Sequence, residues 1–129
     1  MHRLLITCEH GGNRIPVAYR SLFHAQRALL DSHRGYDAGA LSMARELASK
    51  LGAPLLVSSV SRLLVDLNRS MGNRRLHCDA IWDATAEQRR GIVQTYYMPY
   101  RTEAERRVAE AIENGPGVVH VSSHSFTPE

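Results

Sequence analysis

An apolar run that leads directly into a loop of reactive side chains constrains this chain more than any other feature. Leu4, Leu5 and Ile6 form a run that is typical of a buried parallel strand. Segment 8–16 follows without a spacer and reads Cys-Glu-His-Gly-Gly-Asn-Arg-Ile-Pro. Open α/β sheets bind ligands beyond the carboxyl ends of their strands, so we expect His10 to lie at such a position. A helix entry with an uninvolved histidine is the alternative.

A similar pattern occurs at the other end of the chain. Residues 118–123 predict a second buried strand, and His124 follows it at once. If the two strands are parallel neighbours, His10 and His124 meet at one edge of the sheet. Paired imidazoles at strand ends indicate a metal site, with zinc as the first candidate. A capping or core histidine is the alternative for His124.

The alternation of strand and helix patterns predicts the fold class. Leucines and alanines recur every three or four residues from about Gly39 to Leu51, which predicts a helix that Gly52 ends. Residues 54–60 predict the next strand, and 100–113 a longer helix after a shorter one at 84–93. We therefore expect an α/β protein with a mostly parallel sheet and helices on its faces. Residues 62–69 are predicted to be extended, and 70–83 to form a surface loop.

Size and composition limit the classes of function. The 129 residues fit one domain, which we expect to span 1–129, and no apolar run reaches the length of a membrane span. The net charge of +3 comes from dispersed basic residues rather than from a block of the kind that binds nucleic acid. Cys8 and Cys78 are expected to be reduced thiols, with Cys8 acting as a small apolar residue. We expect no nucleic-acid or membrane partner and, because the sequence opens on a strand rather than a signal peptide, a cytoplasmic location.

Two further polar groups have spacings that suggest chemistry. Arg62 precedes segment 66–69, which reads Asp-Leu-Asn-Arg, and arginine forks bind carboxylates in a bidentate manner. Asp66 could hold one of the arginines in place; a surface ion-pair cluster is the alternative. His33 and Asp37 are four residues apart and share a face if the segment is helical. Asp37 could then orient an imidazole, or it could simply cap the following helix.

Five segments together resemble the N-formylglutamate amidohydrolase family. They occur in the family's order and span nearly the whole chain: 8–16, 33–40, 61–69, 97–101 and 123–128. The resemblance implies a three-layer α/β/α sandwich around a mostly parallel mixed sheet, similar to zinc carboxypeptidases and aspartoacylases. It also implies zinc-dependent hydrolysis of the amide of an N-acyl acidic amino acid, with N-formylglutamate giving formate and glutamate.

The resemblance also implies a set of metal ligands. The zinc-binding His-x-x-Glu pattern of the related carboxypeptidases matches His10 and falls on Asn13, and the later histidine ligand matches His124. Asn13 departs from the pattern because an amide is a poorer zinc ligand than a carboxylate. Glu9 or Asp37 could substitute for it as the third ligand, and Glu9 is also a candidate catalytic base.

The expected substrate contacts follow from the same comparison. The Asn-Arg pair that holds the substrate carboxylate in those enzymes matches Asn68 and Arg69. Arg62 is expected to make a second anion contact and to support catalysis. Arg14 and Ser125 are expected in the same substrate pocket.

The position of the last predicted strand suggests that the chain is the front part of a longer protein. Pro128 and Glu129 follow that strand without a covering helix, and the family's general base is expected in a later segment. We therefore expect an incomplete sheet edge, a tendency to self-associate and little activity of this form alone. A non-catalytic binding protein for acidic small molecules, or an inactive fragment, remain the alternatives.

Overall fold

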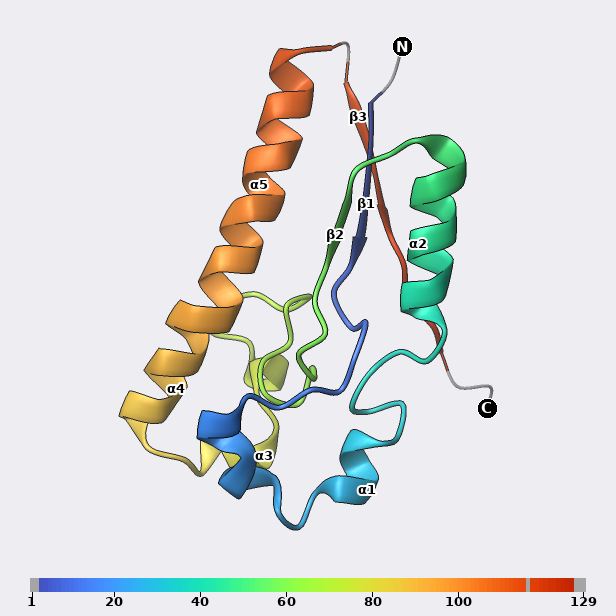
Figure 1. Cartoon of the computed structure of the whole chain (residues 1–129). Helices are drawn as coiled ribbons and strands as arrows, with labels where there is room; N and C mark the ends of the chain where they lie inside the picture. The colour runs from blue at the N-terminus through green and yellow to red at the C-terminus, as the bar shows by residue number, and fades with distance from the viewer. Residues whose placement is uncertain (1–2, 116, 127–129) are drawn as a thin grey trace.

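A sheet of three parallel strands forms the centre of the protein. The computed structural model describes residues 3–115 and 117–126. Strands β1 (Arg3–Cys8), β2 (Leu55–Val57) and β3 (Val118–Ser122) are arranged in the order β2-β1-β3 (Figure 1). β1 therefore pairs with both neighbours, and it lies beside β3 from the far end of the chain. The prediction that the strands before His10 and His124 are parallel neighbours is confirmed.

Helix α2 (Ala40–Leu51) packs on one face of this sheet. The side chains of Ile6 and Cys8 form a buried cluster with the helix alanines Ala40, Ala44 and Ala48, whose small size allows the helix to approach the sheet closely. Gly52 ends the helix with a positive φ of 59°, as its sequence position predicts. The α/β class is thus confirmed, and the helix lies where it can hold the carboxyl end of β1.

Helix α5 (Met98–Glu113) lies on the opposite side of the sheet from α2 (Figure 1). It continues from α4 (Ala86–Ile92) through a π turn at Val93–Tyr97, whereas the sequence suggested two separate helices. Pro99 lacks an N–H group and cannot complete the usual helical hydrogen bond. The π turn directly before it changes the hydrogen-bond spacing, which lets the chain remain helical through the proline.

A second core lies beyond the carboxyl ends of the strands, packed against the loops that follow β1 and β2. It buries apolar side chains from several segments, among them Ile15, Phe23, Leu64, Ile81 and Ile92. The 3-10 helix η1 (Val17–Phe23) and the short helix α1 (Arg27–Leu30) cover one side of it. This core holds the polar loops of the protein against the carboxyl ends of the strands.

Two predicted segments differ from the structure. Residues 62–69 form turns instead of an extended segment, because Leu63, Leu64 and Val65 are all buried in the second core and cannot alternate between two faces. Residues 70–83 are not a plain surface loop: they contain η2 (Arg74–Leu76) and α3 (Asp79–Trp82), which also contribute buried residues. The three strands of the described region are all parallel, so they do not show the expected mixed sheet. None of the described helices is both long and apolar enough to span a membrane.

Candidate metal centre

The ends of β1 and β3 bring three potential metal ligands together. His10 follows β1, His124 follows β3, and Asp37 lies in the turn before α2. The backbone N–H of Asp37 donates to the carbonyl of His10 at 2.9 Å, which fixes the turn against the end of β1. We call these three residues, His10, Asp37 and His124, the metal centre; one potential ligand atom from each lies within 4.8 Å of the others.

The two imidazoles present the same ring nitrogen to Asp37. Its Oδ2 atom lies 3.4 Å from Nδ1 of His10 and 2.9 Å from Nδ1 of His124. The ring centroids are 5.1 Å apart at an interplanar angle of 64°, so the rings do not stack. His10 and Asp37 are buried, while His124 is partly exposed. The centre is therefore open on the His124 side.

Asp66 holds the other ring nitrogen of His10. Its Oδ1 atom accepts a hydrogen bond from Nε2 of His10 at 2.6 Å and another from the backbone N–H of Asn68 at 2.9 Å. Burial raises the pKa of Asp66, but these hydrogen bonds and nearby positive charge outweigh burial, so the pKa lies below its ordinary value. An ionised carboxylate can only accept, so Nε2 of His10 carries the hydrogen. The sequence suggested that Asp66 holds an arginine, and the structure adds this contact with His10.

A chain of hydrogen bonds holds His124 in the same tautomer. Ser122 donates its hydroxyl proton to Glu9, so its oxygen accepts from Nε2 of His124 at 2.8 Å. Tyr100 donates to the other oxygen of Glu9 at 2.7 Å. Burial raises the pKa of Glu9, but hydrogen bonds from Ser122, Thr7 and Tyr100 together with the charge of His124 outweigh burial and leave the pKa below its ordinary value. Glu9 is thus held as an acceptor behind His124.

This arrangement suits a bound cation. When both rings are neutral with Nε2 protonated, their Nδ1 lone pairs face the carboxylate of Asp37. Three electron-rich atoms in one place repel one another unless a cation lies between them. Two imidazole nitrogens and one carboxylate oxygen form a donor set that zinc accepts readily, and hydrogen-bonded partners on the far ring nitrogens are typical of metal-binding histidines. The residues present therefore fit a metal ion, although its identity is not fixed by them.

A basic cavity adjoins the metal centre. It has a volume of about 210 Å³ and is lined by all three residues of the centre and by Arg62, Asn68, Arg69, Ser125, His33 and Phe126. Arg62 lies 3.5 Å from Asp37 and 3.3 Å from Asp66, and Nε of Arg69 lies 3.7 Å from Asp66. A basic hollow of about 580 Å³ lies beside this cavity; it shares Arg62 and Arg69 with the cavity and is also lined by Arg34, Arg74 and Arg75. The approach to the metal centre is therefore suited to anions.

Several predicted substrate residues do line this cavity. Arg62, Asn68, Arg69 and Ser125 all do so, and the backbone N–H of Ser125 donates to Asp37 at 3.4 Å. His33 lines the cavity at its exposed rim, but the segment between it and Asp37 forms turns rather than a helix. Asp37 does not cap α2, whose N-cap residue is Gly39.

Three predicted site residues lie elsewhere. Asn13, expected at a metal-ligand position, instead donates its amide to the Leu30 carbonyl at 3.1 Å, which turns it away from the metal centre. Arg14 lines a different cavity and donates to Ser59. Glu9 bonds to Ser122 and does not line the cavity, and its role as a base stays a prediction.

Sequence reasoning did not identify Ser122 or Tyr100 as part of the site. Tyr100 lies in one of the five family-like segments, which is the signal that could have suggested it. Its contact with Glu9 joins α5 to the end of β1, and burial together with Glu9 raises its pKa well above the ordinary value, so it remains a donor. Cys8 is buried, and burial raises its pKa to about 11, which agrees with its expected role as a small apolar residue.

This chain is similar to a protein of known structure and to a known family. The chain is similar to the crystal structure of a gene product of Agrobacterium tumefaciens, with 31% sequence identity and a TM-score of 0.88. The similarity covers 98% of this chain and 53% of that chain, so this chain spans about half the length of that protein. A comparison with curated proteins found no match. The sequence profile of the N-formylglutamate amidohydrolase family matches residues 2–129, and on this evidence the chain belongs to that family.

Proposed function

We propose that this chain carries the metal centre and the substrate-anion site of a zinc-dependent hydrolase that cleaves the amide of an N-acyl acidic amino acid, with N-formylglutamate as the substrate. The observation that supports this most strongly is the convergence of His10, Asp37 and His124 on the cavity that Arg62 and Arg69 line. Family membership supports the hydrolase class. The proposal extends to the fold, for which we infer a larger sandwich of the zinc-carboxypeptidase type.

The metal would be held by Nδ1 of both histidines and by the carboxylate of Asp37. When bound, zinc supplies Lewis acidity, which polarises the scissile carbonyl and makes water more acidic. The role of the protein is to keep these three donors in place before metal arrives. Asp66 fixes the ring of His10, and Ser122 with Glu9 fixes the ring of His124.

The arginines would bind and orient the substrate. Arg62 and Arg69 are partly exposed, and each has one side of its guanidinium group close to Asp66. Their remaining N–H groups are available to the carboxylates of glutamate, and Asn68 adds an amide donor at the same rim. Two anchored carboxylates would fix the acyl group over the metal centre, which lowers the entropic part of the activation barrier.

One observation favours a second candidate, a non-catalytic binding protein for acidic small molecules. Among the described residues that line the cavity, Asp37 is the single carboxylate, and it belongs to the metal centre. The general base that hydrolysis needs is therefore not among these carboxylates. His33, at the rim, is the remaining titratable group that does not belong to the metal centre or to the arginine pair.

Binding and turnover of N-formylglutamate distinguish the two candidates. We would load the protein with zinc, measure N-formylglutamate binding by calorimetry, and measure formate release in parallel. Arg69→Ala should weaken binding about 10- to 100-fold at unchanged zinc content, since a charge-assisted hydrogen bond contributes about 1.5–3 kcal/mol. Arg45→Ala, on the exposed side of α2, is the matched control and should bind like the unmodified protein.

Each outcome has a clear meaning. Binding with formate release supports the hydrolase, and binding without formate release supports the carboxylate site while showing that this chain alone does not turn over the substrate. Failure to bind N-formylglutamate, or equal binding by Arg69→Ala, would show that the assignment of the carboxylate site is wrong.

A further inference from the structure

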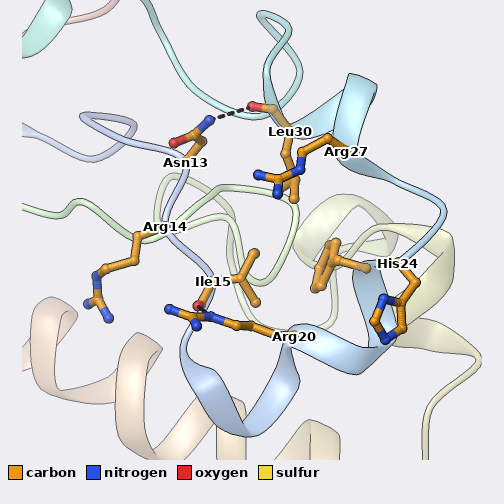
Figure 2. A pocket seen from close by; sticks show the side chains of 8 residues that line it. Asn13, Arg14, Ile15, Arg20, His24, Arg27 and Leu30 are labelled. Carbon is orange, nitrogen blue, oxygen red and sulfur yellow. Dashed lines mark hydrogen bonds between the residues drawn. The ribbon is translucent and has the colours of Figure 1, made fainter.

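A second cavity lies on the side of the protein formed by the loop after β1, the 3-10 helix η1 and helix α1 (Figure 2). Its volume is about 480 Å³, which is within the usual range of about 300–1,000 Å³ for small-molecule sites. It shares no lining residue with the cavity at the metal centre or with the basic hollow beside that cavity. A ligand bound here would therefore not occupy the substrate site.

Three arginines give the second cavity positive charge, and one carboxylate, that of Asp31, is hydrogen-bonded to its lining residue Asn13 at 3.2 Å. Arg14, Arg20 and Arg27 line it, and guanidinium groups remain protonated in proteins. Arg14 donates to the Ser59 hydroxyl at 3.2 Å and Arg20 to a backbone carbonyl at 3.3 Å, both neutral acceptors. No ion pair joins any of the three to a carboxylate within residues 3–115 and 117–126. Arg106, by contrast, pairs with two glutamates.

The floor of the cavity is apolar. Ile15 and Phe23 line it and belong to the second core, where both are buried. Figure 2 shows that Arg20 and Arg27 come from segments on opposite sides of the opening, with Ile15 between them. The amide of Asn13 donates to the Leu30 carbonyl at 3.1 Å, which ties the loop after β1 to α1 and keeps the two sides together. These contacts hold the two sides of the cavity in place.

We propose that this cavity is a second ligand site, separate from the metal centre, for an organic anion that combines a carboxylate or phosphate group with an apolar body. The anionic group lies on the side of the cavity that Arg20 and Arg27 line, and the apolar body covers Ile15 and Phe23. Arginine recognises both kinds of oxyanion through paired N–H groups, so the shared chemistry is a planar or tetrahedral oxyanion. His24 lines the same cavity and can add a further hydrogen bond. This proposal does not depend on the proposed function.

Calorimetric titration with phenyl phosphate tests the proposal. Phenyl phosphate supplies both an oxyanion and an aromatic ring, whereas inorganic phosphate supplies the anion alone and benzyl alcohol the ring alone. We expect phenyl phosphate to bind at least about fivefold more tightly than inorganic phosphate, since the ring buries apolar surface. The double variant Arg20→Gln/Arg27→Gln should weaken phenyl phosphate binding at least about tenfold, because two charged contacts are lost.

Two further variants make the result specific. Arg45→Gln removes an exposed arginine from α2 and should bind phenyl phosphate like the unmodified protein. Arg69→Gln removes an arginine of the metal-centre cavity, which is itself suited to anions, so it should change only a separate binding event there. The proposal is overturned if phenyl phosphate does not bind, if it binds no better than inorganic phosphate, or if the double variant, folded by circular dichroism, binds phenyl phosphate as tightly as the unmodified protein. Because Arg20 and Arg27 lie at the surface, the double variant is expected to fold, and Arg27→Gln alone provides a second, milder test.

Discussion

Replacing Asp66 should weaken metal binding although Asp66 is not expected to touch the metal. Its carboxylate is buried and accepts from Nε2 of His10 at 2.6 Å. This hydrogen bond holds the ring of His10 so that Nδ1 faces Asp37, and the negative charge of Asp66 makes the imidazole a stronger metal ligand. Loss of such a supporting partner typically reduces metal affinity about 10- to 100-fold, or by about 1.4–2.8 kcal/mol.

The structure indicates where in this range two variants should fall. In Asp66→Asn, the amide oxygen can still accept from His10 and from the backbone N–H of Asn68, so ring orientation is kept while the charge is lost. The amide NH₂ group then faces the guanidinium group of Arg62, so two hydrogen-bond donors face each other without an acceptor. We expect a loss near the lower limit, about tenfold. Asp66→Ala loses both acceptors and should approach about 100-fold.

Competition between the protein and a chromophoric chelator for zinc measures these affinities directly. Asp83→Asn, which changes an exposed aspartate in the same way, is the control. Thermal melts recorded without metal show whether each variant is folded. If both Asp66 variants fold and bind zinc within about twofold of the unmodified protein, then the hydrogen bond between Asp66 and His10 does not support a metal ligand.

Three further predictions concern the rest of the chain. Burial lowers the pKa of His77 below its ordinary value of 6.5, so between about pH 7.5 and about pH 5.5 the unfolded chain takes up a proton that the folded chain does not. The free energy of unfolding in urea should therefore decrease as the pH falls through this range. The decrease should be smaller in His77→Asn than in the exposed control His24→Asn. A side chain at Gly12 would place Cβ 2.7 Å from the backbone oxygen of Ser59, so Gly12→Ala should cost about 1–3 kcal/mol and lower Tm; an unchanged Tm would contradict the close approach. β3 lies at an edge of the described sheet and Phe126 beyond it is 91% exposed, so light scattering should detect oligomers, and a monomer at high concentration would argue against self-association.

The elements with strong local patterns could be predicted from the sequence. The apolar run before His10, the periodic leucines and alanines before Gly52, and the valines before His124 each produced the expected strand or helix. The pairing of the first and last strands could also be expected from the sequence, because parallel strands connected by helices can be ordered in a sheet in few ways. The two histidines therefore met as predicted.

The third member of the metal centre depended on contacts between distant parts of the chain. The family-like spacing indicated Asn13, but the loop after β1 turns this side chain toward Leu30. Asp37 reaches the histidines because its backbone is bonded to His10 across 27 positions. No local pattern encodes this contact, so the sequence leaves Glu9 and Asp37 as equal candidates for the third ligand.

The turn at 62–69 also depends on contacts between distant parts of the chain. Its apolar residues Leu63, Leu64 and Val65 predict an extended segment, but the second core buries them in a turn. This turn places Arg62 and Asp66 side by side, with Asp66 directed at His10. The contact of Glu9 with Tyr100 likewise joins residues 91 positions apart and could be found only with the fold in hand.

The zinc content of the protein, measured after loosely bound metal has been removed, distinguishes the possible third ligands. Elemental analysis should find about one zinc ion per chain in the unmodified protein, very little in Asp37→Ala, and about one in Asn13→Ala. This comparison separates the ligand that the structure indicates from the one that the sequence pattern suggested. A metal-free unmodified protein, zinc retained by Asp37→Ala, or zinc lost from Asn13→Ala would contradict a metal centre made of His10, Asp37 and His124.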